Sequence, residues 1–155
     1  YHWWTGCDEG AVALRAQTWW RIRLQDDVRF FRARSLERLR WHQLQGHDVV
    51  LLSGSFRQLI EPLAAALQVT RTITTELVVR EGRFTGEIAR PMIGQAKATA
   101  IAEDAEEHNI DLSESYGYGD HKSDLAFLSR VGFPSLVAGF VPGAETLSDR
   151  LEVWD

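Results

Sequence analysis

The apolar run at positions 48–52, Asp-Val-Val-Leu-Leu, restricts the fold of this chain more than any other segment. It is too short for a helix and too uniformly apolar for a strand with one face in water, so it predicts a buried strand of a parallel sheet. Ser53-Gly54-Ser55 follows, and apolar residues then recur at helical spacing over residues 56–67. A strand, a turn and a helix in this order form half of a βαβ unit.

The rest of the chain continues this alternation of strands and helices. Further helices are predicted at 8–45, with a break near 26–27 and a C-terminal cap at Gly46, at 95–107 and at 144–150. Further strands are predicted at 76–80 and 83–88, joined as a hairpin by Glu81-Gly82, and at 116–118, 135–138 and 151–154. The alternation predicts an α/β fold built on a doubly wound parallel sheet.

Length, charge and cysteine content narrow the functional classes. The 155 residues can bury one core, and a net charge of -5 argues against a nucleic-acid or anionic-membrane surface. The arginine-rich run at 32–40 has apolar residues at helical spacing, which is typical of a solvated amphipathic helix. The single cysteine, Cys7, suits a reducing compartment, and no apolar run reaches the roughly 20 residues of a membrane span. We therefore expect a cytoplasmic protein with no nucleic-acid or membrane partner.

Two carboxylates, Asp120 and Asp124, stand four residues apart where the predicted strand at 116–118 turns into a helix. Open α/β sheets bind ligands at this carboxyl edge, and Gly119 lets the backbone approach a ligand closely. Two anions one helical turn apart repel unless a cation lies between them, and Mg²⁺ suits oxygen ligands best. The alternative is that Asp120 caps the helix and Asp124 complements its dipole.

Ser53, Gly54 and Ser55 are expected at the same kind of sheet edge, ahead of a helix. The Ser53 hydroxyl and the backbone N–H groups of Gly54 and Ser55 can bind a phosphate there, although Ser53 alone also fits an ordinary helix cap. Lys97 stands near the start of the helix predicted at 95–107, where its cation can balance a phosphate and the carboxylates. A lysine on a helix is more often simply solvated.

Taken in order, the serine after a strand, the lysine on a later helix and Gly-Asp-x-x-x-Asp resemble the second, third and fourth motifs of the haloacid dehalogenase superfamily. The segments 39–55 and 119–125 resemble its phosphoserine-phosphatase-like branch, subfamily IB, which carries a helical C1 cap inserted after the first motif. The resemblance covers residues 32–155. It implies that residues 31–155 form a Rossmann-like α/β core and that residues 1–30 are a remnant of the helical cap at the N-terminus.

The resemblance also implies a role for each candidate residue. Ser53, Gly54, Ser55 and Lys97 would bind the phosphoryl group of a small-molecule phosphomonoester. Asp120 and Asp124 would form the Mg²⁺ site, and Lys97 and Asp124 would serve catalysis by stabilising charge on the transferring group. The implied activity is a Mg²⁺-dependent phosphatase that works through an aspartyl-phosphate.

The first motif of this superfamily, Asp-x-Asp-x-Thr or Val, does not occur in the sequence. Cys7-Asp8-Glu9-Gly10 lacks a preceding apolar strand, and Asp26-Asp27 has the wrong spacing. We expect that an upstream piece with the first strand, the nucleophilic aspartate and most of the cap is absent from this chain. The alternative is a catalytically degenerate module that binds a phospho-ligand or a partner protein.

Two further features concern the substrate and the oligomeric state. Ser123 and Arg57 stand where the phosphoserine phosphatases usually have asparagine and an acidic residue, which puts phosphoserine itself in doubt as the substrate. Tryptophans crowd the N-terminal segment at Trp3, Trp4, Trp19 and Trp20. We expect these side chains in the core or under a partner, so a homo-oligomer formed through the N-terminal helices is a further prediction.

Overall fold

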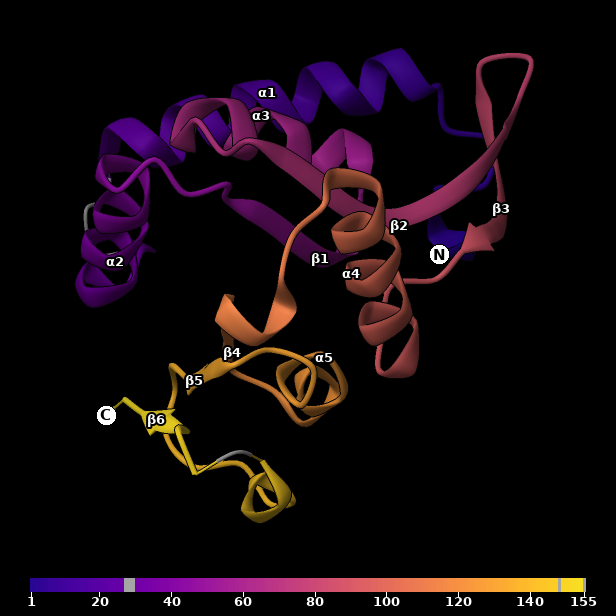
Figure 1. Cartoon of the computed structure of the whole chain (residues 1–155). Helices are drawn as coiled ribbons and strands as arrows, with labels where there is room; N and C mark the ends of the chain where they lie inside the picture. The colour runs from indigo at the N-terminus through magenta and orange to yellow at the C-terminus, as the bar shows by residue number, and fades with distance from the viewer. Residues whose placement is uncertain (27–29, 148, 155) are drawn as a thin grey trace. The chain divides into compact units, whose positions relative to one another are not determined.

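The computed structural model describes residues 1–26, 30–147 and 149–154, which pack as two compact units, Tyr1–Met92 and Ile93–Asp155 (Figure 1). The elements of the first unit follow one another as η1 (His2–Trp4), α1 (Glu9–Asp26), α2 (Ala33–Leu44), β1 (Val50–Phe56), α3 (Arg57–Leu67), β2 (Arg71–Arg80) and β3 (Arg83–Arg90). The helices and the strand predicted within residues 8–67 are confirmed, although β1 is half-buried up to Ser55 rather than buried. Residue 27 of the predicted break near 26–27 lies outside the described residues. Gly46 follows α2 with a φ of 74°, as a glycine at a helix C-terminus does.

The sheet of the first unit has the order β1-β2-β3, with β1 parallel to β2 and β2 antiparallel to β3. The two residues between β2 and β3, Glu81 and Gly82, both have positive φ angles, 51° and 72°. This is the two-residue connection that follows the right-handed twist of a hairpin. The predicted hairpin is therefore confirmed, and its strands are longer than the alternating apolar pattern indicated.

Helix α1 packs along α3, and α3 packs against β1 and β2 (Figure 1). The indole Nε1 of Trp20 on α1 donates to the Leu59 carbonyl of α3 over 2.7 Å. The buried centre of the unit consists of Val12, Phe56 and Phe84, and the rings of Phe56 and Phe84 meet edge to face. Burial of large aromatic side chains such as these supplies much of the stability of a small core.

The second unit contains α4 (Gln95–His108), η3 (Leu112–Glu114), β4 (Tyr116–Gly119), η4 (Lys122–Asp124), α5 (Leu125–Leu128), β5 (Phe133–Leu136), η5 (Ala144–Thr146) and β6 (Glu152–Val153). Its sheet has the order β4-β5-β6, and both strand pairs are parallel. Helix α5 packs against β4 and α4. The side chains of Leu128, Leu136 and Trp154 are almost fully buried and form its core.

The predicted α/β class with parallel strands is confirmed, with three differences of detail. The described strands lie in two sheets rather than one, because β1 and β4 are each an edge strand. The strand expected at 135–138 is β5, Phe133–Leu136. It can include Pro134 because β6 pairs only with Ser135 and Leu136, so no hydrogen-bond donor is needed from the proline. The helix expected at 144–150 is a single 3₁₀ turn at Ala144–Thr146, and residue 148 lies outside the described residues.

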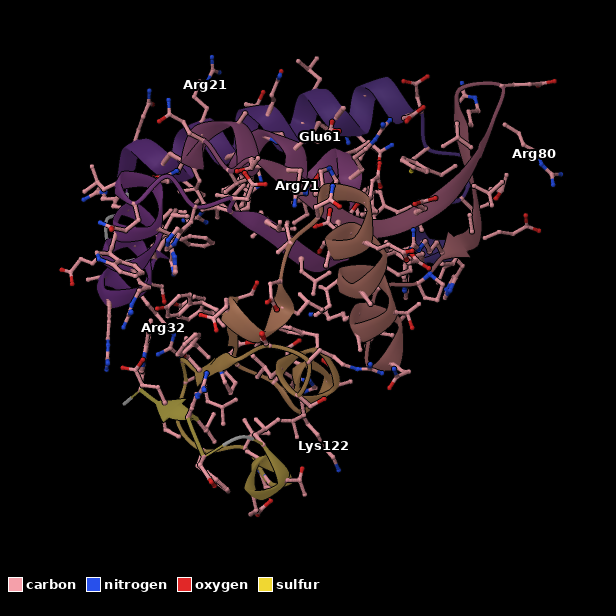
Figure 2. The ribbon with its side chains drawn as sticks, in the orientation of Figure 1. Arg21, Arg32, Glu61, Arg71, Arg80 and Lys122 are labelled. Atoms are coloured by element: carbon pink, nitrogen blue, oxygen red, sulfur yellow. The ribbon has the colours of Figure 1, made fainter. Side chains whose placement is uncertain are left out.

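The four N-terminal tryptophans, which we expected in the core or under a partner, differ in how exposed they are. Trp3 is 85% exposed and Trp19 is 44% exposed, whereas Trp4 and Trp20 are half-buried, so the first two do not belong to the core. Arg21 on α1 and Arg80 at the end of β2 extend away from the ribbon (Figure 2). None of the helices in the described part of the chain is both long and apolar enough to cross a membrane.

Candidate active site

Ser53, Gly54 and Ser55 lie within the last part of β1 rather than in a turn after it. Ser53 faces Thr74 of β2, but the pairing then shifts so that Phe56 faces Thr75. Gly54 and Ser55 therefore form a bulge, a feature that is common beside active sites because it redirects backbone groups. Helix α3 begins at Arg57 with Phe56 as its N-cap residue, so Ser53 is not the cap of this helix.

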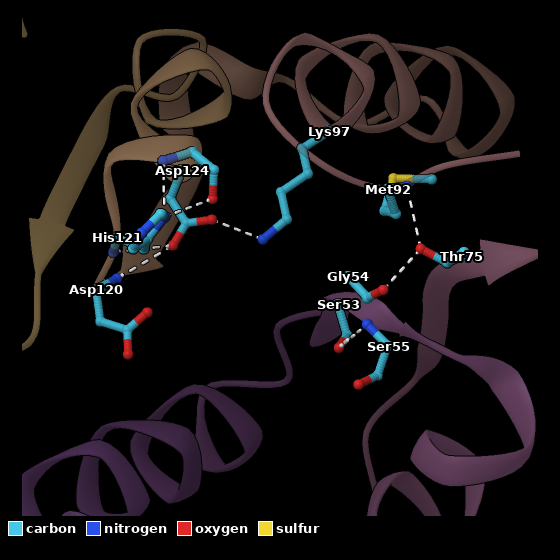
Figure 3. A network of polar contacts seen from close by, with 10 residues as sticks. Ser53, Gly54, Ser55, Thr75, Met92, Lys97, Asp120, His121 and Asp124 are labelled. Atoms are coloured by element: carbon cyan, nitrogen blue, oxygen red, sulfur yellow. Dashed lines mark hydrogen bonds and ion pairs between the residues drawn. The ribbon is translucent and has the colours of Figure 1, made fainter. Parts of the chain in front are cut away.

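Hydrogen bonds fix the bulge on two sides (Figure 3). The Ser55 N–H donates to Ser53 Oγ over 3.1 Å, so the two groups predicted to bind phosphate lie together. The Thr75 hydroxyl donates to the Gly54 carbonyl over 2.7 Å, and the hydroxyl of Tyr1 donates to the same carbonyl. The first unit thus presents a serine hydroxyl beside a backbone N–H on a restrained piece of backbone.

Lys97, in the first turn of α4, is buried and forms an ion pair with Asp124 (Figure 3). Its Nζ lies 2.6 Å from Asp124 Oδ1, and the two side chains are only 11% and 7% exposed. The alternative in which Lys97 is simply solvated is therefore wrong. Burying two charges costs several kcal/mol each in desolvation, so a pair of this kind gives little net stability and is often kept for another reason.

The second oxygen of Asp124 holds the loop that carries Asp120. Asp124 Oδ2 accepts from the backbone N–H groups of Asp120 and His121, each over 3.2 Å. The side chain of His121 accepts from the Ser123 N–H over 3.1 Å and is the N-cap of η4. The alternative in which Asp120 caps the helix is wrong, because His121 has that position and Asp124 completes a reciprocal cap.

Gly119, at the end of β4, leaves room for the Asp124 carboxylate. A Cβ at this position would lie 2.7 Å from Asp124 Cβ and 3.1 Å from its Oδ2. The sequence indicated that this glycine would let a ligand approach, but in the structure the close neighbour is Asp124. Gly119 therefore acts on the site through the placement of Asp124.

The Asp120 side chain is exposed, and it supplies a hard oxygen donor next to the Lys97–Asp124 pair. Among the residues that the structure describes, no three His, Cys, Asp or Glu side chains gather as a metal cage. Mg²⁺ typically keeps several waters and binds through one or two carboxylates, so a single exposed carboxylate fits it better than it fits metals that need a full set of protein ligands.

The structure thus brings Lys97, Asp120 and Asp124 together in the second unit and Ser53, Gly54 and Ser55 together in the first. Sequence reasoning missed Thr75 and left the part played by His121 open. Thr75 stands in a run of β-branched residues that reads only as a strand, so its hydroxyl gave no separate signal. The cap formed by His121 depends on a loop conformation that residue types alone do not indicate.

A model of the haloacid dehalogenase-like hydrolase family matches residues 3–129, a range that includes all of these site residues. The chain belongs to this family. A relative from Mycobacterium tuberculosis named "Probable phosphatase" is 40% identical over 96 residues, which cover 62% of this chain and 33% of that protein. The match therefore spans about a third of the length of this curated relative.

Solved structures of other proteins share the fold. A protein of unknown function from Bordetella pertussis Tohama I matches 95% of this chain and 70% of its own, with a TM-score of 0.75 and 24% identity. A phosphoserine phosphatase in its apo form matches 77% of this chain and 59% of its own, with a TM-score of 0.64 and 19% identity. The chain is therefore a haloacid dehalogenase-like hydrolase whose fold resembles that of phosphoserine phosphatase.

Proposed function

We propose that this chain is part of a Mg²⁺-dependent phosphatase that hydrolyses a small-molecule phosphomonoester through an aspartyl-phosphate. In this reaction a carboxylate oxygen attacks phosphorus, the alcohol leaves, and water then releases phosphate from the acyl-phosphate. Ser53 and the bulge at Gly54-Ser55 bind the phosphoryl oxygens, and Lys97 supplies the positive charge that balances them. The nucleophilic aspartate lies outside these 155 residues.

The observation that most supports this proposal is the buried Lys97–Asp124 ion pair. A lysine fixed by a carboxylate in a site with little water stabilises negative charge more strongly than a solvated one, because its neighbours need not reorganise as charge builds up. Asp124 also fixes Asp120 through the backbone, so one buried carboxylate orients the lysine and the metal-binding candidate.

Asp120 would hold Mg²⁺ through its exposed carboxylate, and Asp124 would support this position from behind. When bound, the ion neutralises charge on the phosphoryl oxygens. The residues of this chain bind and orient the phosphoryl group: Ser53 Oγ donates to its oxygens, the Ser55 N–H holds that serine oxygen in place, and Lys97 Nζ offers a further donor.

We further propose that residues 31–155 are a core from which the first strand is missing, and that residues 1–30 are a remnant of a helical cap. The position of β1 and β4 at the edges of their sheets supports a missing strand, since an edge strand has a backbone side available for pairing. Cys7 as the only cysteine supports a cytoplasmic location, and the exposed Trp3 and Trp19 support self-association.

The second candidate is a module that binds a phospho-ligand or a partner protein without turnover. It is favoured by one observation, the lack of an Asp-x-Asp-x-Thr or Val sequence within these 155 residues. The two candidates differ in whether a longer form of the protein releases phosphate.

The test is phosphate release from a generic aryl phosphate, with Mg²⁺ and after its removal, by this chain and by an upstream-extended form. We expect activity only in the extended form with Mg²⁺, and a loss of at least about 100-fold in Asp120→Asn, as for removal of one strong charge-stabilising group. The control is Glu106→Gln, which removes one exposed carboxylate on α4 and should leave the rate unchanged. Folded protein that releases no phosphate in any form would favour the binding module.

A further inference from the structure

Thr75 is a buried strand residue whose hydroxyl forms hydrogen bonds with two backbone groups. It donates to the Gly54 carbonyl over 2.7 Å and accepts from the Met92 N–H over 3.1 Å (Figure 3). Thr75 is 2% exposed and Met92 is 1% exposed, whereas Gly54 is half-buried, so the threonine side chain itself is shielded from bulk water. Since Met92 supplies the donor to Thr75 Oγ1, the threonine proton is directed at Gly54.

This contact determines which way the peptide between Gly54 and Ser55 faces. A trans peptide is planar, and its C=O and N–H point in opposite directions. Because the Gly54 carbonyl points to Thr75, the Ser55 N–H must point away from Thr75, and it donates to Ser53 Oγ over 3.1 Å. A peptide turned the other way would direct a carbonyl oxygen, instead of an N–H, toward the Ser53 hydroxyl.

The backbone conformation by itself does not hold the bulge in this orientation. Gly54 has no positive φ angle, and a Cβ there would meet only the Met92 carbonyl oxygen at 3.4 Å, an ordinary contact. The bulge also interrupts the ladder to β2 between Ser53 and Phe56. The orientation of the peptide therefore depends on hydrogen bonds, and the one from Thr75 comes from a buried side chain.

We propose that Thr75 is a positioning residue for phosphoryl binding. Its hydroxyl holds the Gly54–Ser55 peptide so that the Ser55 N–H donates to Ser53 Oγ, which leaves the Ser53 proton to bind a phosphoryl oxygen. This inference rests on the proposed phosphatase function. A donor fixed before the ligand arrives binds an anion better than one that must first reorganise.

A purely structural role would give a different result, because it would lower stability without changing phosphate affinity. Thr75→Val keeps the shape and removes the hydroxyl, whereas Thr75→Ser keeps the hydroxyl. Thr85→Val on β3 is a matched control, since Thr85 Oγ1 also donates to a carbonyl, that of Val78, and accepts from a backbone N–H, that of Glu87. Both valine variants should lower the melting temperature, so stability does not separate the two roles.

The experiment measures two constants in the extended protein, KM for an aryl phosphate and the inhibition constant for inorganic phosphate as a competitive inhibitor. It also follows the shift of the Ser55 amide resonance when inorganic phosphate is added. We expect Thr75→Val to raise KM and the inhibition constant by about tenfold or more, the effect of one misplaced hydrogen bond to an anion. Thr75→Ser should stay within about threefold of the wild type, and Thr85→Val should match the wild type.

Equal phosphate affinity in Thr75→Val and the wild type, with normal turnover, would overturn this role for Thr75 and leave the phosphatase proposal intact. Wild-type protein that neither hydrolyses the ester nor binds inorganic phosphate would overturn both. Wild-type protein that binds phosphate without turnover would remove the phosphatase proposal, and a tenfold loss of that binding in Thr75→Val would still support the positioning role.

Discussion

Lys97 and Asp124 form a buried ion pair whose presence is not explained by stability alone. Their charges are almost fully removed from solvent, and Asp124 Oδ2 also accepts from the N–H groups of Asp120 and His121. Replacing such a pair by apolar residues is often neutral or stabilising, whereas removing one member leaves a buried charge without its partner. The pair therefore makes physical sense as a device that holds a cation in a fixed place.

Gly119 is the residue on which this arrangement depends most directly. We expect Gly119→Ala to destabilise the fold by roughly 1–3 kcal/mol, because the added methyl group must displace the Asp124 carboxylate, 2.7 Å away at its Cβ. The rate of phosphate release should fall by more than the unfolded fraction of the variant accounts for, since both Lys97 and Asp120 are oriented through Asp124. Urea unfolding of the variant and its rate of phosphate release are the two measurements.

Gly10→Ala provides the control for this substitution. Gly10 lies in the first turn of α1, where a Cβ would meet only Asp8 Oδ1 at 3.4 Å. Alanine there should be neutral or stabilise by up to about 1 kcal/mol through helix propensity. Equal stability of Gly119→Ala and the wild type would contradict the space argument.

At the scale of elements, His42 in the last turn of α2 and His47 in the segment after the helix form a pair that should make stability depend on pH. His42 Nδ1 lies 2.9 Å from His47 Nδ1, so one of the two nitrogens must lack a proton. Burial, then the charges of His47 and Arg38, lower the pKa of His42 from 6.5 to about 4. Between pH 6.5 and 4, the His42 imidazole is therefore protonated in the unfolded state but mostly neutral in the folded state.

The sign of the effect follows from this lowered pKa. Above pH 6.5 neither state binds the proton and the fold has its full stability, and stability falls as the pH drops from 6.5 toward 4. The loss at the lower end is of the order of 3 kcal/mol, at about 1.4 kcal/mol for each pKa unit. Chemical denaturation between pH 7 and 4.5 measures it, and His42→Gln should flatten the slope. The same slope in both proteins would contradict the assignment to His42.

Some of the helices and strands could be predicted from the sequence and others could not. The helices at Ala33–Leu44, Arg57–Leu67 and Gln95–His108 follow from local sequence patterns, and Gly46 also marks the end of the first of them. The extension of β1 through Ser53, Gly54 and Ser55 could not be predicted from local patterns, because the bulge depends on pairing with β2 and not on the residue types within β1. Propensity likewise gave residues 144–150 a helix where packing allows one 3₁₀ turn.

The candidate site divides in the same way. Ser53, Lys97, Asp120 and Asp124 could be chosen from their order along the chain, and the internal geometry of each unit is compatible with those choices. The burial of Lys97, the cap at His121 and the hydroxyl of Thr75 depend on contacts between residues 2 to 27 positions apart, which a single sequence does not specify.

At the scale of the whole molecule, the chain carries two sets of phosphoryl-binding candidates in two compact units, and its match spans about a third of a curated relative. A phosphatase would need both sets to act on one phosphoryl group. Residues that act as a unit in catalysis show strongly non-additive effects, so their coupling can be measured without a further structure.

The most direct measurement is therefore a double-mutant cycle on kcat/KM for an aryl phosphate, with Ser53→Ala and Lys97→Met in the extended protein and with each variant shown to be folded. We expect each substitution to lower kcat/KM by at least about 100-fold, and the double variant to lose far less than the product of the two, because both residues stabilise the same transferring group. Full activity in Ser53→Ala, or losses that multiply without coupling, would contradict a shared phosphoryl-transfer centre.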